Sequence, residues 1–345
     1  MECFKIGDRI IGMNELTFFI AEIGSNHDGS IEQAKKLIKA SKDAGADAVK
    51  FQSFTAEGLF NPFKEEDGEW IPHPAYPVIE KLTLPEKWHT ELKAYSDSIG
   101  IIFLSAPFDK GRAKLLNKIG VPAFKVASGD LTNDPLLKQI AGYKKPVIIS
   151  TGAAYLGEVE RAIDIIRNAG NEEIAVLHCA SLYPPKFEDS NVRAMVTLSD
   201  AFHLPVGYSD HTPGWTVPLA AVSLGGCIIE KHITLSRSLK GPDHPYALEA
   251  NEFKTMVAET RNLEIALGDG LKRPVDDEIG ERFGARRSIY SAKEIKQGKV
   301  IKESMLKLVR HASGLEPKDI YAIIGKKALR DINEHELITW KDIEC

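Results

Sequence analysis

The chain has 345 residues, of which 43% are hydrophobic and 27% are charged, and its formal net charge is -5. This is the composition of a globular protein with a large core. The slightly negative charge argues against a nucleic-acid binder or a protein held on an anionic membrane surface. No apolar run approaches the ~18 residues that span a bilayer.

Eight short runs of apolar and β-branched residues recur between residues 18 and 233. Each run is too continuously apolar for a strand with one face in water, and this is typical of parallel strands buried on both faces. Helical patterns lie between them, for example over residues 31–45, where Ser30 and Gln33 form a capping box. The predicted strands are residues 18–24, 48–53, 101–107, 123–128, 146–151, 174–180, 205–210 and 227–233.

Eight strands that alternate with helices predict a (β/α)8 (TIM) barrel over residues 1–275. A doubly wound sheet is the alternative, but no GxGxxG follows the first strand. Residues 4–11 are predicted to form a hairpin that closes the bottom of the barrel. Residues 54–85 are long for a loop between a strand and a helix, and predict either a lid over the catalytic face or a surface decoration.

The pattern changes after Leu267. Residues 276–286 are predicted to be a linker, and residues 287–345 a small domain of short apolar pieces separated by Gly, Asn and Asp. A domain of about 60 residues has a marginal core, so we expect it to be stabilised by packing against a partner.

The four cysteines, Cys3, Cys179, Cys227 and Cys345, form no CxxC pair. We expect them to be reduced thiols. The first residues lack the basic start and the apolar run of a signal peptide. Together these features predict a cytoplasmic protein.

Polar side chains gather at the C-terminal ends of the predicted strands, where barrels of this type place their chemistry. Lys50 and Lys125 lie inside apolar strands, and burying an ammonium group is costly unless an anion pairs with it. An internal salt bridge would meet this need, but two lysines with several hydroxyl groups favour a phosphate or carboxylate substrate. The other candidates at these ends are Glu22, Gln52, Ser128, Asp130, Ser150, Ser181, Tyr183 and Ser209.

His211 and His232 end two neighbouring predicted strands. One histidine in such a place is most simply a hydrogen-bonded core residue, but two on adjacent strands favour a divalent metal site. Asp210 and Glu230 are then either groups that orient the ligands or simple ion-pair partners. Asp243, in the turn 241–244, is either a turn residue or an acceptor for a sugar hydroxyl.

Seven short motifs recur along the barrel part of the chain: 20–29 (IAEIGSNHDG), 45–52 (GADAVKFQ), 124–129 (FKVASG), 150–152 (STG), 207–212 (GYSDHT), 229–232 (IEKH) and 241–244 (GPDH). In this order, they resemble the motifs of the N-acetylneuraminate (sialic acid) synthase family, and the resemblance covers nearly the whole chain. The segment from Gln297 to Ile343 is similar to the antifreeze-like (SAF, β-clip) domain of that family.

The resemblance implies a transferase that condenses phosphoenolpyruvate with an N-acetylated mannose-type aldose. The product is a nine-carbon 2-keto-3-deoxy sugar acid, and phosphate is released. The resemblance also implies a domain-swapped homodimer, in which the small domain of one chain caps the barrel of the other. No nucleic acid or membrane partner is expected.

The resemblance also assigns roles to residues. Glu22 and Asp130 would be catalytic, and His211 and His232 would hold a divalent metal. Manganese suits a site of nitrogen and oxygen ligands, with magnesium or cobalt as alternatives. The residues expected to bind phosphoenolpyruvate are Lys50, Lys125, Ser128, Ser150, Ser181 and Ser209, and those expected to bind the sugar are Gln52, Tyr183, Asp243 and Arg310, the last from across the dimer.

The chain departs from the family pattern near both substrates. Asp130 stands where glutamate is common, Ser181 where asparagine is frequent, and residues 311–314 replace a proline-glycine pair. The acceptor could therefore be N-acetylmannosamine, its 6-phosphate, or a 6-deoxy or di-N-acetylated sugar that yields legionaminic or pseudaminic acid. A metal-dependent aldolase with a pyruvate-type donor and a non-catalytic carbohydrate-binding protein are the alternatives from other classes.

Overall fold

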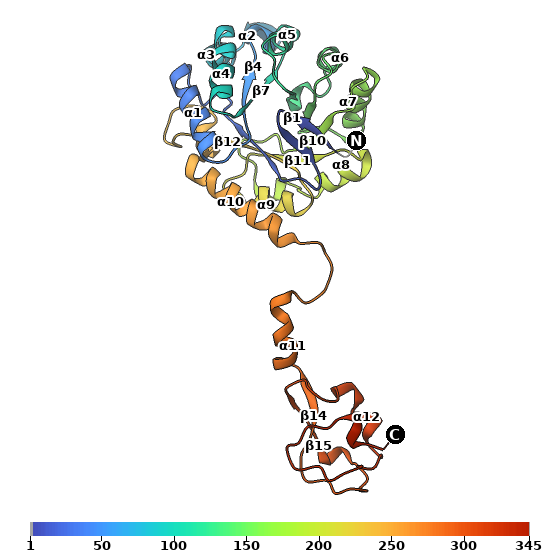
Figure 1. Ribbon diagram of the computed structural model, residues 1–345. Helices are drawn as coiled ribbons and strands as arrows, with labels where there is room; N and C mark the ends of the chain where they lie inside the picture. Colours follow the sequence, from blue (N-terminus) through green and yellow to red (C-terminus); the bar gives the residue numbers. More distant parts are fainter. Residues whose placement is uncertain (1–2, 345) are drawn as a thin grey trace. The chain divides into compact units, whose positions relative to one another are not determined.

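The computed structural model describes residues 3–344. The chain divides into two compact units at the boundary between Gly268 and Asp269. Eight parallel strands form the centre of the first unit and follow one another in chain order around it (Figure 1). They are β3 (Phe18–Glu22), β4 (Ala48–Ser53), β7 (Ile102–Pro107), β8 (Phe124–Val126), β9 (Val147–Ser150), β10 (Ile174–His178), β11 (Val206–Asp210) and β12 (Ile228–Thr234).

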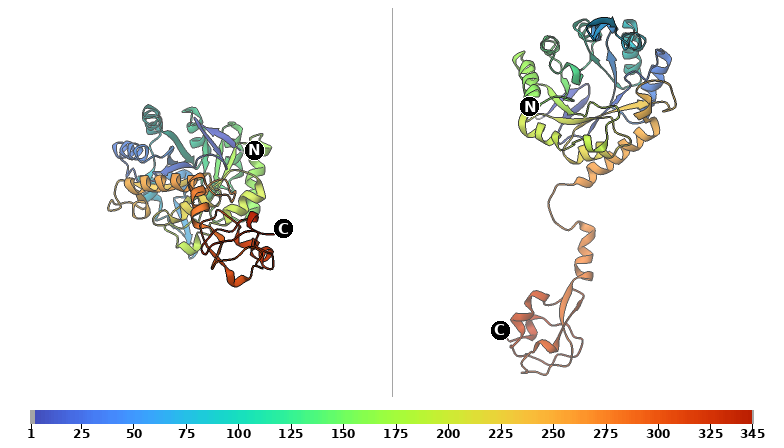
Figure 2. Two further views of the ribbon diagram at one scale, coloured as in Figure 1. Left: turned by 60° about the horizontal axis from the view of Figure 1, so that its bottom comes forward. Right: turned by 180° about the vertical axis from the view of Figure 1, so that it is seen from behind.

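The ring of strands is nearly closed. Strand β12 pairs with β3, and β7 and β8 lie next to one another at the remaining gap. Helices surround the strands, as the views from two further sides also show (Figure 2). The predicted (β/α)8 barrel is thus confirmed, with all eight predicted strands present. The surrounding helices are α1 (Ile31–Asp43), α4 (Glu86–Ser98), α5 (Lys110–Lys118), α6 (Asp134–Gly142), α7 (Leu156–Asn168), α8 (Ala194–Phe202), α9 (Thr216–Ser223) and α10 (Ala250–Leu267).

Helix α1 shows why these segments become helices. Its N-cap Ser30 accepts the predicted hydrogen bond from the backbone N–H of Gln33 at 3.2 Å. The other half of the predicted capping box is absent, because the Gln33 side chain donates to Asn26 and Asp28 instead. One face of the helix, with Ala34, Leu37 and Ile38, is buried against the strands. The apolar spacing of three and four residues therefore sets which side of the helix faces the barrel.

Alternate residues of each strand face opposite sides, so the barrel has two cores. Phe19 and Val49 belong to the core between strands and helices, whereas Ile20 and Ala48 belong to the core inside the barrel. The antiparallel hairpin of β1 (Cys3–Ile6) and β2 (Arg9–Gly12) adds to this inner core. Its contributions, which confirm the expected closure of the barrel bottom, are Phe4, Ile6 and Ile11.

Gly207 on β11 is required by a close approach of two strands. A Cβ at this position would lie 2.2 Å from the carbonyl oxygen of Ile228 on β12 and 2.8 Å from the side chain of Leu177. Only a residue without a side chain fits there, because the inner core is already filled at this level.

The insertion between β4 and α4 has secondary structure of its own. It contains α2 (Ala56–Leu59), the hairpin of β5 (Phe63–Glu66) and β6 (Glu69–Pro72), and α3 (Tyr76–Leu82). The hairpin is largely exposed to solvent. The short strand β13 (Leu248–Glu249) pairs with β12 and leads into α10.

The second unit has a small core of its own, formed by residues that include Ile289, Ile301 and Ile338. Its regular elements are the antiparallel strands β14 (Arg287–Ser291) and β15 (Leu306–Arg310), with the helices α11 (Ile279–Ala285) and α12 (Ile320–Ile323). Helix α11 occupies a segment that was expected to be a linker. None of the helices within residues 3–344 has the length and apolar content to cross a membrane.

Candidate active site

The C-terminal ends of β3, β4, β8 and β12 place two ammonium groups and two carboxylates at the floor of one cavity. Lys50 Nζ lies 2.7 Å from Glu22 Oε2 and 3.7 Å from Glu230 Oε1. Lys125 Nζ lies 4.0 Å from Glu230 Oε2. Gln52 donates a hydrogen bond of 2.8 Å to Glu22 Oε1. All four charged groups are buried, so this cluster is held in a region of low dielectric constant.

The pKa of each charged group at the floor depends on the charges of the others. Burial acts to lower the pKa of Lys50, but the carboxylates of Glu22 and Glu230 outweigh it, and the pKa is raised. Burial lowers the pKa of Lys125, because Glu230 offsets the loss of solvation only in part and Lys50 adds repulsion. Burial also opposes ionisation of Glu230, yet Lys125 and Lys50 hold the pKa of that carboxyl well below its usual range. An anionic substrate that brings further negative charge would stabilise both ammonium groups.

Hydroxyl groups surround the same floor. Lys125 Nζ donates a hydrogen bond to Ser150 Oγ, and Ser209 Oγ donates one of 2.8 Å to Glu230. Nearby, the backbone N–H of Gly152 donates to Ser128 Oγ at 3.0 Å. A Cβ on Gly152 would lie 2.1 Å from Ser181 Oγ and 2.9 Å from Ser128 Oγ. The missing side chain of Gly152 thus leaves a cradle of hydrogen-bonding groups suited to a phosphate or carboxylate.

The imidazole rings of His211 and His232 lie side by side above the floor, with centroids 5.3 Å apart and an interplanar angle of 53°. The Nδ1 atoms of both are buried without a hydrogen-bond partner. Burial, followed by repulsion from His232, lowers the pKa of His211 to about 3. This imidazole is therefore neutral near pH 7, as a metal ligand must be.

These two rings fit a divalent metal ion. Their unpartnered nitrogens are the observation that supports the fit, because an unpaired buried nitrogen is costly unless something binds it. Within residues 3–344, no group of three or more His, Cys, Asp or Glu side chains forms a ready ligand set. A metal here would need substrate or water oxygens for its other positions, as catalytic sites that keep open positions do.

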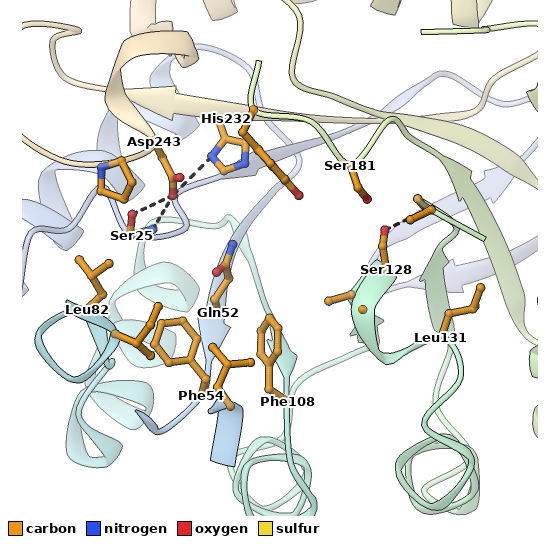
Figure 3. A pocket seen from close by; sticks show the side chains of 18 of the residues that line it. Ser25, Gln52, Phe54, Leu82, Phe108, Ser128, Leu131, Ser181, His232 and Asp243 are labelled. Atoms are coloured by element: carbon orange, nitrogen blue, oxygen red, sulfur yellow. Dashed lines mark hydrogen bonds and ion pairs between the residues drawn. The ribbon is translucent and has the colours of Figure 1, made fainter. Parts of the chain in front are cut away.

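Asp243 lies beside His232 and is held from three sides. Its Oδ2 accepts hydrogen bonds from the backbone N–H of Ser25 at 3.1 Å and from Ser25 Oγ at 2.8 Å, and it lies 3.9 Å from His232 Nδ1. Its Oδ1 accepts one from Tyr246 at 2.7 Å. Figure 3 shows Ser25, Asp243 and His232 together on one side of the pocket. Asp243 is thus part of the site rather than a simple turn residue.

A cavity of about 690 Å³ opens above these groups. Gln52, Tyr183, His232 and Asp243 line its polar part. Its other wall is apolar, and Figure 3 shows several of these side chains gathered opposite Asp243. The insertion supplies Phe54, Leu59, Ile79 and Leu82 to this wall, and the segments that follow β7 and β8 supply Phe108 and Leu131.

The structure brings nearly all of the predicted site residues together. Asp130 is an exception: it is absent from the lining of the cavity, and its Oδ1 accepts a hydrogen bond of 3.0 Å from Asn133, the N-cap residue of α6. Its placement favours a role in the turn before α6. Arg310 lies on β15 of the second unit and is exposed. The predicted residues that line the cavity or its floor are Glu22, Lys50, Gln52, Lys125, Ser128, Ser150, Ser181, Tyr183, Ser209, His211, His232 and Asp243.

Two residues of the site were not singled out from the sequence. Tyr246 orients Asp243 together with Ser25, and Cys179 lines the floor with its Sγ 3.2 Å from Ser128 Oγ. The position of Cys179 could have been found, because it follows β10 in phase with the inward-facing Ala175 and Leu177. No pattern in the sequence distinguishes Tyr246 from an ordinary loop tyrosine.

Comparison with known proteins places the chain among close relatives. The model of the NeuB family matches residues 37–272, and that of the SAF domain matches residues 286–344. An uncharacterized protein of Methanocaldococcus jannaschii is 43% identical, with 99% of each chain covered. N,N'-diacetyllegionaminic acid synthase of Legionella pneumophila is 40% identical, covering 97% of this chain and 96% of that one.

Pseudaminic acid synthase of Campylobacter jejuni is 37% identical, with 95% of this chain and 96% of that one covered. The crystal structure of N-acetylneuraminic acid (sialic acid) synthetase from Leptospira borgpetersenii in complex with citrate has 35% identity and a TM-score of 0.74. That alignment covers 81% of this chain and 94% of the other. The predicted resemblance is confirmed.

Proposed function

Because the chain belongs to the NeuB family, we propose that it condenses phosphoenolpyruvate with an N-acetylated mannose-type aldose. The product would be a nine-carbon 2-keto-3-deoxy sugar acid, and phosphate would be released. One observation carries the proposal beyond the family resemblance. Two buried ammonium groups and two imidazoles whose Nδ1 atoms have no hydrogen-bond partner meet in one cavity at the C-terminal end of the barrel.

In the proposed reaction, C3 of phosphoenolpyruvate attacks the aldehyde carbon of the open-chain sugar. Positive charge develops at C2, water adds there, and the C–O bond to phosphate breaks. Lys50 and Lys125, with Ser150, hold the phosphate and carboxylate of the donor and stabilise their charge. Glu22 Oε1, oriented by Gln52, lies where it can move a proton or stabilise the cation at C2.

His211 and His232 would hold the divalent metal, with manganese expected and magnesium or cobalt as alternatives. When bound, the ion supplies Lewis-acid polarisation of the aldehyde oxygen. Asp243, kept in place by Ser25 and Tyr246, would accept a hydrogen bond from a sugar hydroxyl. Ser128 and Ser181 add donors for the anion.

The lining of the cavity supports one class of acceptor over another. None of its residues from the described part of the chain is Lys or Arg, and its charged groups, Asp243 and Glu158, are both acidic. A sugar 6-phosphate would bring two negative charges there without a partner. The apolar wall of Phe54, Leu82 and Phe108 instead suits methyl groups. A 6-deoxy, di-N-acetylated aldose is therefore favoured over a 6-phosphate.

The role of Arg310 and the homodimer are supported by the family resemblance alone. We propose that the small domain of one chain covers the barrel of its partner and that Arg310 reaches the N-acetyl group there. A second unit with a core of this size gains stability from such a partner.

The test is a panel of candidate aldoses with phosphoenolpyruvate, read by phosphate release and product mass. N-acetylmannosamine, its 6-phosphate and a 6-deoxy di-N-acetylated sugar form the panel. The proposal expects phosphate only when donor, aldose and divalent ion are all present. Turnover with pyruvate in place of phosphoenolpyruvate would identify an aldolase, and turnover that a chelator leaves intact would refute the metal. No turnover with any aldose would favour a carbohydrate-binding protein.

A further inference from the structure

A buried ion pair lies behind the two histidines, on the side of the barrel wall that faces the helices. Lys231 on β12 and Asp210 on β11 are directly opposite one another in the strand register. The Lys231 Nζ–Asp210 Oδ2 distance is 2.5 Å, and the side chains are 1% and 0% exposed. Their neighbours along the strands on this side, Tyr208 and Ile229, belong to the outer apolar core.

This pair forms hydrogen bonds with the residues on both sides of His211. Asp210 accepts hydrogen bonds from the backbone N–H and the hydroxyl group of Thr212, both at 3.0 Å. Lys231 donates a hydrogen bond to the carbonyl oxygen of Thr212 as well as to Asp210. The residues before and after His211 are thus joined to one ammonium group, and the next residue after Lys231 is His232.

Stability alone gives no reason for this arrangement. Burying two charges is costly, and well-packed apolar residues in place of a buried ion pair often leave stability unchanged or increased. Because side chains alternate along a strand, Lys231 and Asp210 point away from the cavity and cannot touch a substrate. What they join are the two backbone segments that carry His211 and His232.

We propose that Lys231 is a positioning residue which, with Asp210, fixes the spacing of His211 and His232 for the metal. This inference rests on the proposed function, since it presumes that the two imidazoles bind a divalent ion. A pair of ligands held before the ion arrives binds it more tightly than a pair that must be ordered by it. Loss of the pair is therefore expected to weaken metal binding while the fold persists.

The test uses the full-length double variant Lys231→Met/Asp210→Asn, which removes both charges and so leaves neither one buried alone. Mn²⁺ affinity is measured from the electron paramagnetic resonance signal of the free ion, phosphoenolpyruvate affinity by calorimetry without metal, and stability by thermal unfolding. We expect the Kd for Mn²⁺ to rise by 10-fold to 100-fold, in the range known for groups that orient metal ligands. Phosphoenolpyruvate affinity should change less than twofold.

The matched control is Arg261→Met/Glu264→Gln, which removes a partly buried ion pair of 2.9 Å on α10. It should leave Mn²⁺ affinity unchanged. A Kd for Mn²⁺ within twofold of the original in the folded Lys231→Met/Asp210→Asn variant would overturn the inference. So would a parallel loss of donor affinity and stability, because that indicates a general structural role. If His211→Ala binds Mn²⁺ as well as the unaltered protein, the proposed metal site itself is wrong.

Discussion

Each charged side chain at the cavity floor contacts a side chain on the adjoining strand. The position of a residue in the strand register therefore determines which group it pairs with. Glu22 and Lys50 are direct partners in the pairing of β3 with β4, and Ser209 and Glu230 in that of β11 with β12. Glu22 Oε2 and Glu230 Oε2 accept no hydrogen bond, but each faces the ammonium group of a lysine. The Nδ1 atoms of His211 and His232 also have no hydrogen-bond partner, and they face no ammonium group, so these nitrogens are open to a metal ion.

Replacing His211 or His232 by alanine is expected to weaken Mn²⁺ binding and turnover by at least about 100-fold, since even groups that only orient ligands contribute 10-fold to 100-fold. Circular dichroism should remain unchanged, because neither imidazole holds another side chain by a hydrogen bond through Nδ1. The exposed His203→Asn variant at the end of α8 serves as the control. Metal titration and phosphate release measure the effect, and unaltered affinity in both alanine variants would exclude these ligands.

A third histidine, His89, is expected to make the stability of the barrel depend on pH. Its Nε2 lies 2.7 Å from Ser53 Oγ and its Nδ1 3.1 Å from the carbonyl oxygen of Pro85, and the side chain is fully buried. Burial lowers the pKa of His89 from 6.5 to about 4. Between these values the unfolded chain binds a proton that the folded chain does not, so stability falls as the pH decreases.

The expected loss attributable to His89 is about 3 kcal/mol between pH 7 and pH 4. It should be seen as a difference in slope between the unaltered protein and His89→Gln when the free energy of unfolding in urea is plotted against pH. The absolute stability of the variant at pH 7 does not enter the comparison. Parallel slopes would show that His89 is protonated in the folded protein.

At the scale of elements, the strands and most helices of the barrel follow from the sequence. Continuous apolar runs distinguish buried parallel strands, and the cap at Ser30 marks the start of α1 within one residue. Strand ends are less well predicted: β8 is confined to Phe124–Val126 although the run continues to residue 128. Ser128 and Asp130 instead form a short 3-10 turn, which carries Asp130 away from the cavity.

What could not be predicted depends on contacts distant in sequence. The elements α2, α3, β5 and β6 within residues 54–85 lack a clear period, and only the folded barrel shows that Leu82 faces the cavity. Helix α11 could not be predicted from the sequence either, because its residues Ile279–Ala285 include two glycines and bury no side chain. The inward direction of the polar strand ends, in contrast, follows from the alternation of side chains and was predictable.

The approach of β11 to β12 can be tested at Gly207. Gly207→Ala places a methyl group within 2.2 Å of a backbone carbonyl oxygen, so one strand must shift. The expected cost is about 1–3 kcal/mol or more in the free energy of unfolding, as for overpacked cores. Gly142→Ala in α6, whose added Cβ meets no atom within 4 Å, is the matched control and should stabilise the protein slightly, by about 0.4–1 kcal/mol. Urea denaturation distinguishes the two, and equal stabilities would contradict the close approach.

At the scale of the whole molecule, the question is how the second unit contributes to the reaction. Its core is separate from those of the barrel, and Arg310 stands exposed on β15. The proposed homodimer brings this guanidinium to the partner's cavity, which has no Lys or Arg among its described lining residues. Arg310→Ala should then raise the KM for the aldose about 10-fold or more and leave the KM for phosphoenolpyruvate unchanged. The exposed Lys302→Ala in the same unit is the control.

A dimer in which Arg310 acts on the partner makes a stronger prediction. At low aldose concentration, Arg310→Ala and His211→Ala chains are each expected to release phosphate slowly when alone, but a mixed dimer contains one site with an intact barrel from the first chain and an intact Arg310 from the second. After unfolding and refolding together in equal amounts, about a quarter of all sites should be intact, because half the dimers are mixed and each has one such site. Phosphate release at low aldose concentration measures the recovery. If Arg310 acted within its own chain, mixing would restore no activity, since neither chain carries both groups.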